Sequence, residues 1–515
     1  MDNRLERFST NLEKTASAII LILTLAFILG LTAAAFWETS ILNSEDASGE
    51  NIEFYDDNVF LNIIILSLLL SSAYLFFRHC GGIRFRRMEY ALLFWTFALG
   101  TAYIATTKLR APSYSDSFLV TYGAQRAAVG DYSILSENYF HRFPFQLGYV
   151  LYSEIFFRLM ALFLRSAPEG YAVLALQELN LCWLSLQYRA LIEITGLLFK
   201  DERIRKLLIL LLFFCFPPLL TLPFLYGNVP AYSCGICAVW MMLLFIKKGK
   251  TRYGVLCALL LALAVTLKLN LLIFCAAVGG AWIVMLLKKP SLKSLLCLLF
   301  AAACVFTIPK LPQKIYEKGI GVDYGDGIPM IAWMAMGFNE GYAAPGWYNA
   351  AYTVESFEKN GRDSAETASQ AREIVAQRLH EFLREPSSMF TFFSQKLRSQ
   401  WNEPSCQSLW INEVHLSYSE KNGIYRIFCD SGHRRTLGYM NHYQQLIYLG
   451  ALLGAVLLWK KRRLPNCTLA LIVLGGVLYH MLFEAKSQYA LPYFMLLLPL
   501  AGAGLTALFR KVEFR

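Results

Sequence analysis

The 515-residue sequence is short of charge. Only 17% of its residues are Asp, Glu, Lys or Arg, whereas 56% are hydrophobic. Soluble globular chains carry about 25% charged residues. The sequence also lacks low-complexity linkers and an evident internal repeat. These shortages exclude a string of soluble domains and predict a protein that resides in a membrane.

The signatures of common soluble enzymes are missing as well. The sequence contains no Walker A loop, no dinucleotide-binding fingerprint after a strand, no HExxH and no GxSxG. Nucleotide-driven transport and nucleotide-sugar chemistry by a Rossmann-like domain are therefore unsupported.

A formal net charge of +11 could indicate nucleic-acid binding, but the distribution of the basic residues argues against it. They stand in short runs between apolar stretches: Arg84, Arg86 and Arg87; Lys247, Lys248, Lys250 and Arg252; Lys460 to Arg463; and Arg510 with Lys511. Such runs mark the cytoplasmic loops of a membrane protein with many spans. We expect no nucleic-acid partner.

Long apolar stretches predict an all-α polytopic membrane protein. About 20 apolar residues span a bilayer. Thirteen segments approach that length, near 16–36, 59–77, 88–106, 146–164, 171–199, 207–225, 229–246, 253–267, 270–287, 294–308, 446–459, 466–483 and 489–509.

The loop charges predict the orientation. Residues 37–58 hold seven acids and no Lys or Arg, and are expected outside; residues 78–87 hold four arginines, and are expected inside. Both termini are then cytoplasmic, and the loops 107–145 and 309–445 are extracytoplasmic.

Thirteen full crossings cannot join two cytoplasmic termini, so one segment must be incomplete. The polar segment 171–199 is the first choice and the pair within 253–287 the second, which leaves about twelve transmembrane helices. The domains expected are a transmembrane module at 1–308, an extracytoplasmic domain at 309–445 and C-terminal transmembrane helices at 446–515.

Helical patterns stand out in the outer domain. Asp363 with Glu366 forms a capping box ahead of an amphipathic run, and Pro386 ends it. The next stretch places Phe390 and Trp401 on one face, with Lys396 elsewhere. That helix either lies on the membrane surface or packs in the domain core.

Most of the twelve cysteines lie in apolar stretches, where a thiol packs like a small apolar side chain. Cys234 and Cys237 form a CxxC without a second ligand pair, so packing is favoured over redox or metal use. Cys406 and Cys429 lie in the polar outer segment, where a disulfide and two thiols remain equal alternatives.

Asp116 is the candidate catalytic residue. It lies about ten residues beyond the third span, in the first long outer loop. From there a carboxylate can take a proton from an incoming hydroxyl, as a general base does. An isolated exposed Asp is more often only solvated.

The motifs of this loop resemble those of the C-type (GT-C) glycosyltransferases. They comprise the Asp116 loop, the Gly130 turn and the run Tyr139–Gly148 that enters the next helix. Further matches are Pro217-Pro218 with Tyr226-Gly227-Asn228, Leu267-Lys268-Leu269-Asn270, Lys396 to Trp401 with Glu403-Pro404, and Glu484 to Tyr489. The sequence is similar in particular to a Gram-positive branch of family-39-like proteins, related to protein O-mannosyltransferases and aminoarabinose transferases.

The resemblance implies a GT-C-like core and an inverting enzyme of the bacterial plasma membrane. It would move a sugar from a polyprenyl-phosphate donor to an extracytoplasmic acceptor: a cell-wall polymer, a teichoic acid, a glycolipid or a protein. Asp116 matches the aspartate that acts as base in that superfamily.

Cations are expected to bind the phosphate of the donor, because preorganised positive charge stabilises the leaving group. Lys268 and Lys486 are the first candidates, and Arg142 and His141 are further ones. Where relatives often carry an Arg before the Tyr, this sequence has Gln488, so the phosphate role either has moved to Lys486 or is weaker than in those relatives.

A second acid often accompanies the first in the superfamily. Glu137, Asp131 and Glu154 qualify equally, and some relatives hold a divalent metal at these acids while others do not. Asp430, His433 and His442 lack convincing ligand spacing, so no metal site is assigned. The outer aromatic residues either stack on sugar rings or form the domain core; they are Trp333, Trp347, Tyr348, Trp401 and Trp410.

The main alternative is a polytopic transporter or a flippase of lipid-linked glycans, in which Lys268 and Glu178 would line a path. The 137-residue outer domain and the absence of an inverted-repeat signal count against it. A polysaccharide polymerase or ligase would share the lipid-linked donor.

Overall fold

A computed structural model describes residues 3–43, 49–107, 116–163, 169–416, 426, 431–459 and 464–513. Within these ranges the protein is almost entirely helical. One antiparallel hairpin joins β1 (Glu38–Asn43) to β2 (Asn51–Asp56). The predicted fold class, an all-α polytopic membrane protein, is confirmed.

Eight helical segments in the described ranges are long and apolar enough to cross a membrane. They lie in α1 (Asn3–Trp37), α2 (Val59–His79), α3 (Phe85–Thr107), α10 (Asn228–Lys248), α12 (Leu272–Lys288), α13 (Leu292–Thr307), α22 (Leu464–Leu482) and α23 (Leu491–Glu513). The helix α11 (Thr251–Leu267) is apolar but shorter, and α21 (His433–Trp459) packs extensively against α23. The predicted count of twelve spans is not confirmed.

The predicted incomplete crossing at 171–199 is not among the eight candidate spans of the described residues, and the segment that follows it, 207–225, is broken. The segment 171–199 forms one continuous helix, α7 (Glu169–Phe199), whereas 207–225 breaks into α8 (Glu202–Phe213) and the short α9 (Pro217–Leu220). Proline cannot continue a helix ladder, so Pro217-Pro218 separates the two. A polar residue of α7 forms a hydrogen bond with the chain that follows this break. The side-chain amide of Asn180 donates to the carbonyl of Leu222 at 3.0 Å.

The second predicted interruption, between the segments 253–267 and 270–287, is present. The helix α11 ends at Leu267, a short 3-10 turn covers Leu269–Leu271, and α12 follows. Lys268 is left at the joint between two apolar helices.

The segment 309–445 is mainly helical. Its elements are α14 (Leu311–Ile320), α15 (Met330–Gly337), α16 (Val354–Lys359), α17 (Ser364–Arg384), α18 (Pro386–Trp401) and α19 (Ser408–Leu416). The predicted cap is confirmed, since the carboxylate of Asp363 accepts from the backbone amides of Ala365 and Glu366. The helix ends at Arg384, before Pro386.

The helix α18 is held by a buried lysine. The ammonium of Lys396 donates to the carbonyl oxygens of Gly337, Met481 at 3.0 Å and Phe483 at 2.7 Å. It therefore joins α15 and α18 to the connection between α22 and α23. At the other end of α18, Phe390 is 75% exposed.

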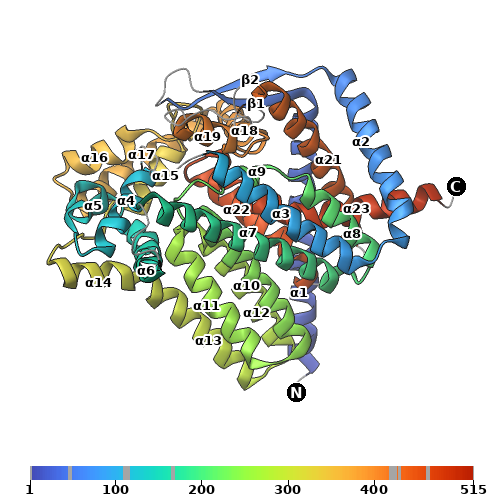
Figure 1. The fold of residues 1–515 in the computed structure, drawn as a ribbon, viewed down its shortest axis with the longest axis horizontal. Helices are drawn as coiled ribbons and strands as arrows, with labels where there is room; N and C mark the ends of the chain where they lie inside the picture. The colour runs from blue at the N-terminus through green and yellow to red at the C-terminus, as the bar shows by residue number, and fades with distance from the viewer. Residues whose placement is uncertain are drawn as a thin grey trace.

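The segment 107–145, predicted as the first outer loop, contributes α4 (Asp116–Ala128) and α5 (Asn138–Arg142), and the predicted span 146–164 forms α6 (Leu147–Phe163). The three segments predicted to lie on one side of the membrane contact one another. The amide of Ser40 donates to the carbonyl of Asn402, and the amide of Ile328 donates to that of Arg142. Figure 1 shows the hairpin and α15–α19 gathered along the upper edge, away from the N-terminus.

The structure describes both residues of one predicted cysteine pair and only one residue of the other. Cys234 and Cys237 are buried in α10, as packing requires. Cys406 is buried too, but Cys429 lies outside the described residues, as does Asp430, so the disulfide stays a prediction.

Candidate active site

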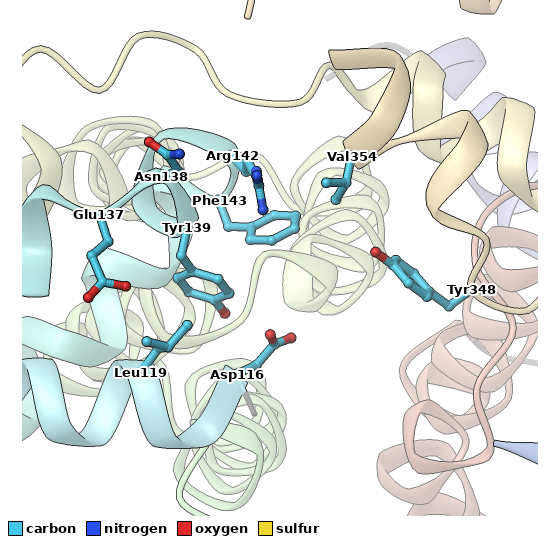
Figure 2. A pocket seen from close by; sticks show the side chains of 9 residues that line it. All are labelled: Asp116, Leu119, Glu137, Asn138, Tyr139, Arg142, Phe143, Tyr348 and Val354. Atoms are coloured by element: carbon cyan, nitrogen blue, oxygen red, sulfur yellow. The ribbon is translucent and has the colours of Figure 1, made fainter. Parts of the chain in front are cut away.

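Asp116 opens onto a cavity of about 660 Å³. It is the first residue of α4, and its side chain is accessible to solvent. Figure 2 shows it pointing into the space between Tyr139 and Phe143 on one side and Tyr348 on the other. The remaining lining residues are Leu119, Glu137, Asn138, Arg142 and Val354. The cavity thus lies between the segment 107–145 and the segment 309–445.

Tyr226 is the hydrogen-bond donor to Asp116. Its hydroxyl lies 3.2 Å from Oδ2 of the carboxylate. The side-chain amide of Gln146 donates to the same hydroxyl, which directs the tyrosine proton toward Asp116, and the Tyr139 hydroxyl lies 3.5 Å away.

Gly227 allows the backbone turn that follows Tyr226. Its φ of +82° is a left-handed conformation that glycine adopts without strain. A Cβ there would lie 3.0 Å from the carbonyl oxygen of Leu267, so the turn packs directly against the end of α11. This contact brings the Tyr226 motif beside Lys268.

Lys268 reaches the same tyrosine from the other side. Its ammonium lies 3.4 Å from the centroid of the Tyr226 ring, a cation–π contact. It is close enough to Asp116 for its charge to lower the pKa of that carboxyl. Within the described part of the chain, no carboxylate forms an ion pair with Lys268. Burial lowers the pKa of its ammonium to about 7, while the charges of Asp116 and Glu484 oppose that fall, so a bound anion would favour the charged form.

Lys486 also acts on Asp116, but acidic partners surround it. Its ammonium lies 2.8 Å from Oε1 of Glu50 and 4.0 Å from Oε1 of Glu484. Gln407 donates to the same oxygen of Glu50 at 2.8 Å. Burial alone would lower the pKa of Lys486, but Glu50 and Glu484 together raise it. Lys486 is thus a charged residue whose charge is locally balanced.

The net effect on Asp116 is a raised pKa. The surrounding protein displaces much of the water that would stabilise the carboxylate, and this desolvation is the largest influence. Lys486, the Tyr226 hydrogen bond and Lys268 oppose it in that order, and Glu50 adds to the rise. A carboxyl poised in this way is a better proton acceptor than an ordinary aspartate.

The other predicted cations are placed less favourably. Arg142 lines the cavity, but its Nε lies 2.6 Å from Oε1 of Glu358. His141 is absent from the lining, and its ring lies 5.4 Å from that of Tyr324.

The three candidate second acids lie in different environments. Glu137 lines the cavity. Asp131 pairs with Arg126, whose Nε donates to it at 2.9 Å, and Glu154 is buried against Arg158 and Tyr316. Only Glu137 of the three faces the same space as Asp116. The described residues hold no group of three or more His, Cys, Asp or Glu side chains placed to bind a metal ion.

The outer aromatic residues divide between the two roles considered. Tyr348 lines the cavity, whereas Trp347 and Trp401 are fully buried in the core. Trp333 packs on Phe143, with ring centroids 6.0 Å apart, and Trp410 packs against the small cluster around Trp347.

Sequence reasoning did not assign a role to Glu50, Glu484 or Glu358. Glu50 lies in the acid-rich loop 37–58, but the acids of that loop predicted only its side of the membrane and no contact with Lys486. The departure at Gln488 also has a structural meaning: its side-chain oxygen accepts from the amide of Asn228 at 2.9 Å.

Comparison with known proteins gives a family and a distant structural neighbour. A family model described as a conserved hypothetical integral membrane protein matches residues 172–506. No curated protein matches the sequence. Among solved structures, the chain is similar to the archaeal oligosaccharyltransferase AglB from Archaeoglobus fulgidus, determined with an inhibitory peptide and a dolichol-phosphate. The TM-score is 0.40 at 13% identity, covering 82% of this chain and 51% of that one, so this chain spans about half the length of AglB.

Proposed function

The chain belongs to the family of conserved hypothetical integral membrane proteins, and we propose that it is a GT-C-type membrane glycosyltransferase with Asp116 as its general base. One observation carries the proposal. A solvent-accessible carboxylate with a raised pKa faces a cavity, and a cation without a carboxylate partner lies on the other side of the tyrosine that binds that carboxylate.

The donor is a sugar linked to a polyprenyl phosphate. Lys268 follows the last residue of one apolar helix and precedes another, so a lipid-borne phosphate meets it at the edge of the apolar layer. Because no carboxylate of the described chain neutralises Lys268, we assign the phosphate contact to it first. Lys486 then neutralises the negative charges of Glu50 and Glu484 beside the site.

The acceptor enters the cavity on the outer-domain side, past Tyr348 and Val354. Its hydroxyl oxygen attacks the anomeric carbon as the bond from that carbon to the phosphate oxygen breaks. The hydroxyl proton passes to Asp116, and the polyprenyl phosphate departs with the electron pair of the broken bond. The configuration at the anomeric carbon inverts. Glu137 is the preferred second acid, placed to orient the acceptor.

Substitution of Asp116 tests the proposal. We expect Asp116→Asn to lower sugar transfer by about 10²- to 10⁴-fold, the usual contribution of a general base. The measurement is transfer of radiolabelled sugar from synthetic short-chain polyprenyl-phosphate donors, with membrane extract supplying acceptors. Asp131→Asn is the matched control, since Asp131 lies in the same loop but pairs with Arg126.

Two results would contradict the proposal. If the folded Asp116→Asn variant transferred sugar at the wild-type rate, another group would be the base. If the wild type transferred nothing from any donor of the panel, the donor class would be wrong, and transport of lipid-linked glycans would become the leading interpretation.

A further inference from the structure

The helix α14 continues the apolar helix α13 beyond the thickness of a bilayer. The candidate span runs over 29 residues, Leu292–Ile320. At about 1.5 Å per residue a helical segment of that length extends roughly 43 Å, whereas the hydrocarbon core measures about 30 Å. The 3-10 turn Ile308–Lys310 divides α13 from α14 at the depth where the hydrocarbon should end.

One face of α14 is fixed against the protein. Pro312 and Tyr316 are buried, and the hydroxyl of Tyr316 donates to the carboxylate of Glu154. Glu154 also pairs with Arg158 at 2.7 Å, both on α6. The rotation of α14 about its axis is therefore set. This also gives Glu154 a role outside the cavity, in anchoring the helix.

The opposite face carries an apolar pair beside a basic stripe. Leu311 and Ile315 are 48% and 51% exposed. Lys310, Lys314 and Lys318 are exposed at four-residue spacing, and none of them forms an ion pair with the described residues. Residues four apart share a helix face, so the three ammonium groups lie in one row.

We propose that α14 lies in the headgroup layer of the leaflet where α13 ends and that its lysine row binds anionic phospholipid. The apolar pair enters the acyl boundary and the ammonium groups meet the lipid phosphates, as in interfacial amphipathic helices. The continuity of α14 with an apolar helix of spanning length favours the bilayer over any other partner. This inference does not depend on the proposed enzymatic function.

Lipid retention tests the charge. Wild type and the triple variant Lys310→Gln, Lys314→Gln, Lys318→Gln are reconstituted in nanodiscs of phosphatidylcholine with increasing phosphatidylglycerol. After extraction, native mass spectrometry counts the phosphatidylglycerol that stays bound. We expect several-fold less retention in the triple variant. The control is Lys247→Gln, Lys248→Gln, Lys250→Gln, which removes equal charge from the last turn of α10 and the turn that leads into α11.

A labelling experiment tests the position independently of the triple variant. Ile315→Cys in phosphatidylcholine nanodiscs should react with a charged maleimide several-fold more slowly than Lys359→Cys, an exposed position on α16. The labelling of wild type gives the background of the native cysteines. Equal lipid retention by the two triple variants would overturn the proposal, and so would labelling of Ile315→Cys as fast as Lys359→Cys.

Discussion

The ammonium of Lys268 lies 3.4 Å from the centre of the Tyr226 ring, and the hydroxyl at the far end of that ring donates to Asp116. One aromatic side chain thus separates the cation from the carboxylate and holds both. The two charges cannot collapse into an ion pair while the ring stands between them. In the proposed reaction the ring keeps the group that receives the proton apart from the group that binds the phosphate.

Removal of the Lys268 charge should weaken donor binding. We expect Lys268→Met to raise the KM for the polyprenyl-phosphate donor by about tenfold to 100-fold, because a hydrogen bond to a charged group contributes about 1.5–3 kcal/mol. Lys268→Arg should recover part of the loss. The measurement is the transfer rate as a function of donor concentration, with Lys247→Met as a control for lost positive charge. An unchanged KM in Lys268→Met would assign the phosphate to another residue.

The hydroxyl of Tyr226 should matter for turnover more than for donor binding. Tyr226→Phe keeps the ring beneath Lys268 but removes the donor to Asp116. We expect kcat to fall about tenfold with little change in the donor KM, since one hydrogen bond to a carboxylate is lost. Tyr226→Leu removes the ring as well and should raise KM too. Identical kinetics for the two variants would mean that the cation–π contact has no role in donor binding.

The acid limb of the pH–rate profile should move in opposite directions in two variants. A base acts only when ionised, so activity should fall as the pH drops through the raised pKa of Asp116. Lys486 lowers that pKa and Glu50 raises it. Lys486→Met should therefore shift the acid limb to higher pH, and Glu50→Gln should shift it to lower pH. Profiles of kcat/KM that shift in the same direction would exclude Asp116 as the titrating group.

The buried ammonium of Lys396 should stabilise the contact of α15 and α18 with the connection between α22 and α23. Lys396→Met fits an apolar chain into the space but leaves three carbonyl groups without their donor. We expect a loss of about 2–4 kcal/mol in the free energy of unfolding. Thermal unfolding in detergent measures it, with the exposed Lys359→Met as control. Equal midpoints for the two variants would show that water replaces the lost donor.

The sequence predicts local features of this fold better than contacts between distant segments. Asp363 and Pro386 mark the limits of α17 because capping and helix termination depend on neighbouring residues. The hairpin β1–β2 was not predicted, since its acid-rich segment indicated only a solvated loop. Its strands are fixed by distant partners: Arg398 on α18 lies 2.7 Å from Oε2 of Glu38.

The same limit applies to the site. Asp116, Lys268 and Lys486 could be named from residue type and motif, and the structure brings these three together. That Glu50 would balance Lys486 could not be predicted, because the two residues are 436 positions apart. Lys396 was placed off the apolar face of its helix by helical spacing, yet it is 1% exposed. Spacing shows which way a side chain points but not what another segment brings to meet it.

The three hydrogen bonds of Lys396 have a consequence for how the chain is made. Two of the acceptor carbonyls, at Met481 and Phe483, lie 85 and 87 residues further along the chain. At about 5–20 residues per second, translation supplies them roughly 4 to 17 s after the lysine. Until then only one of its three acceptors, the carbonyl of Gly337, has been synthesised. The contact of α18 with the connection between α22 and α23 therefore forms only after the chain has been synthesised past Phe483.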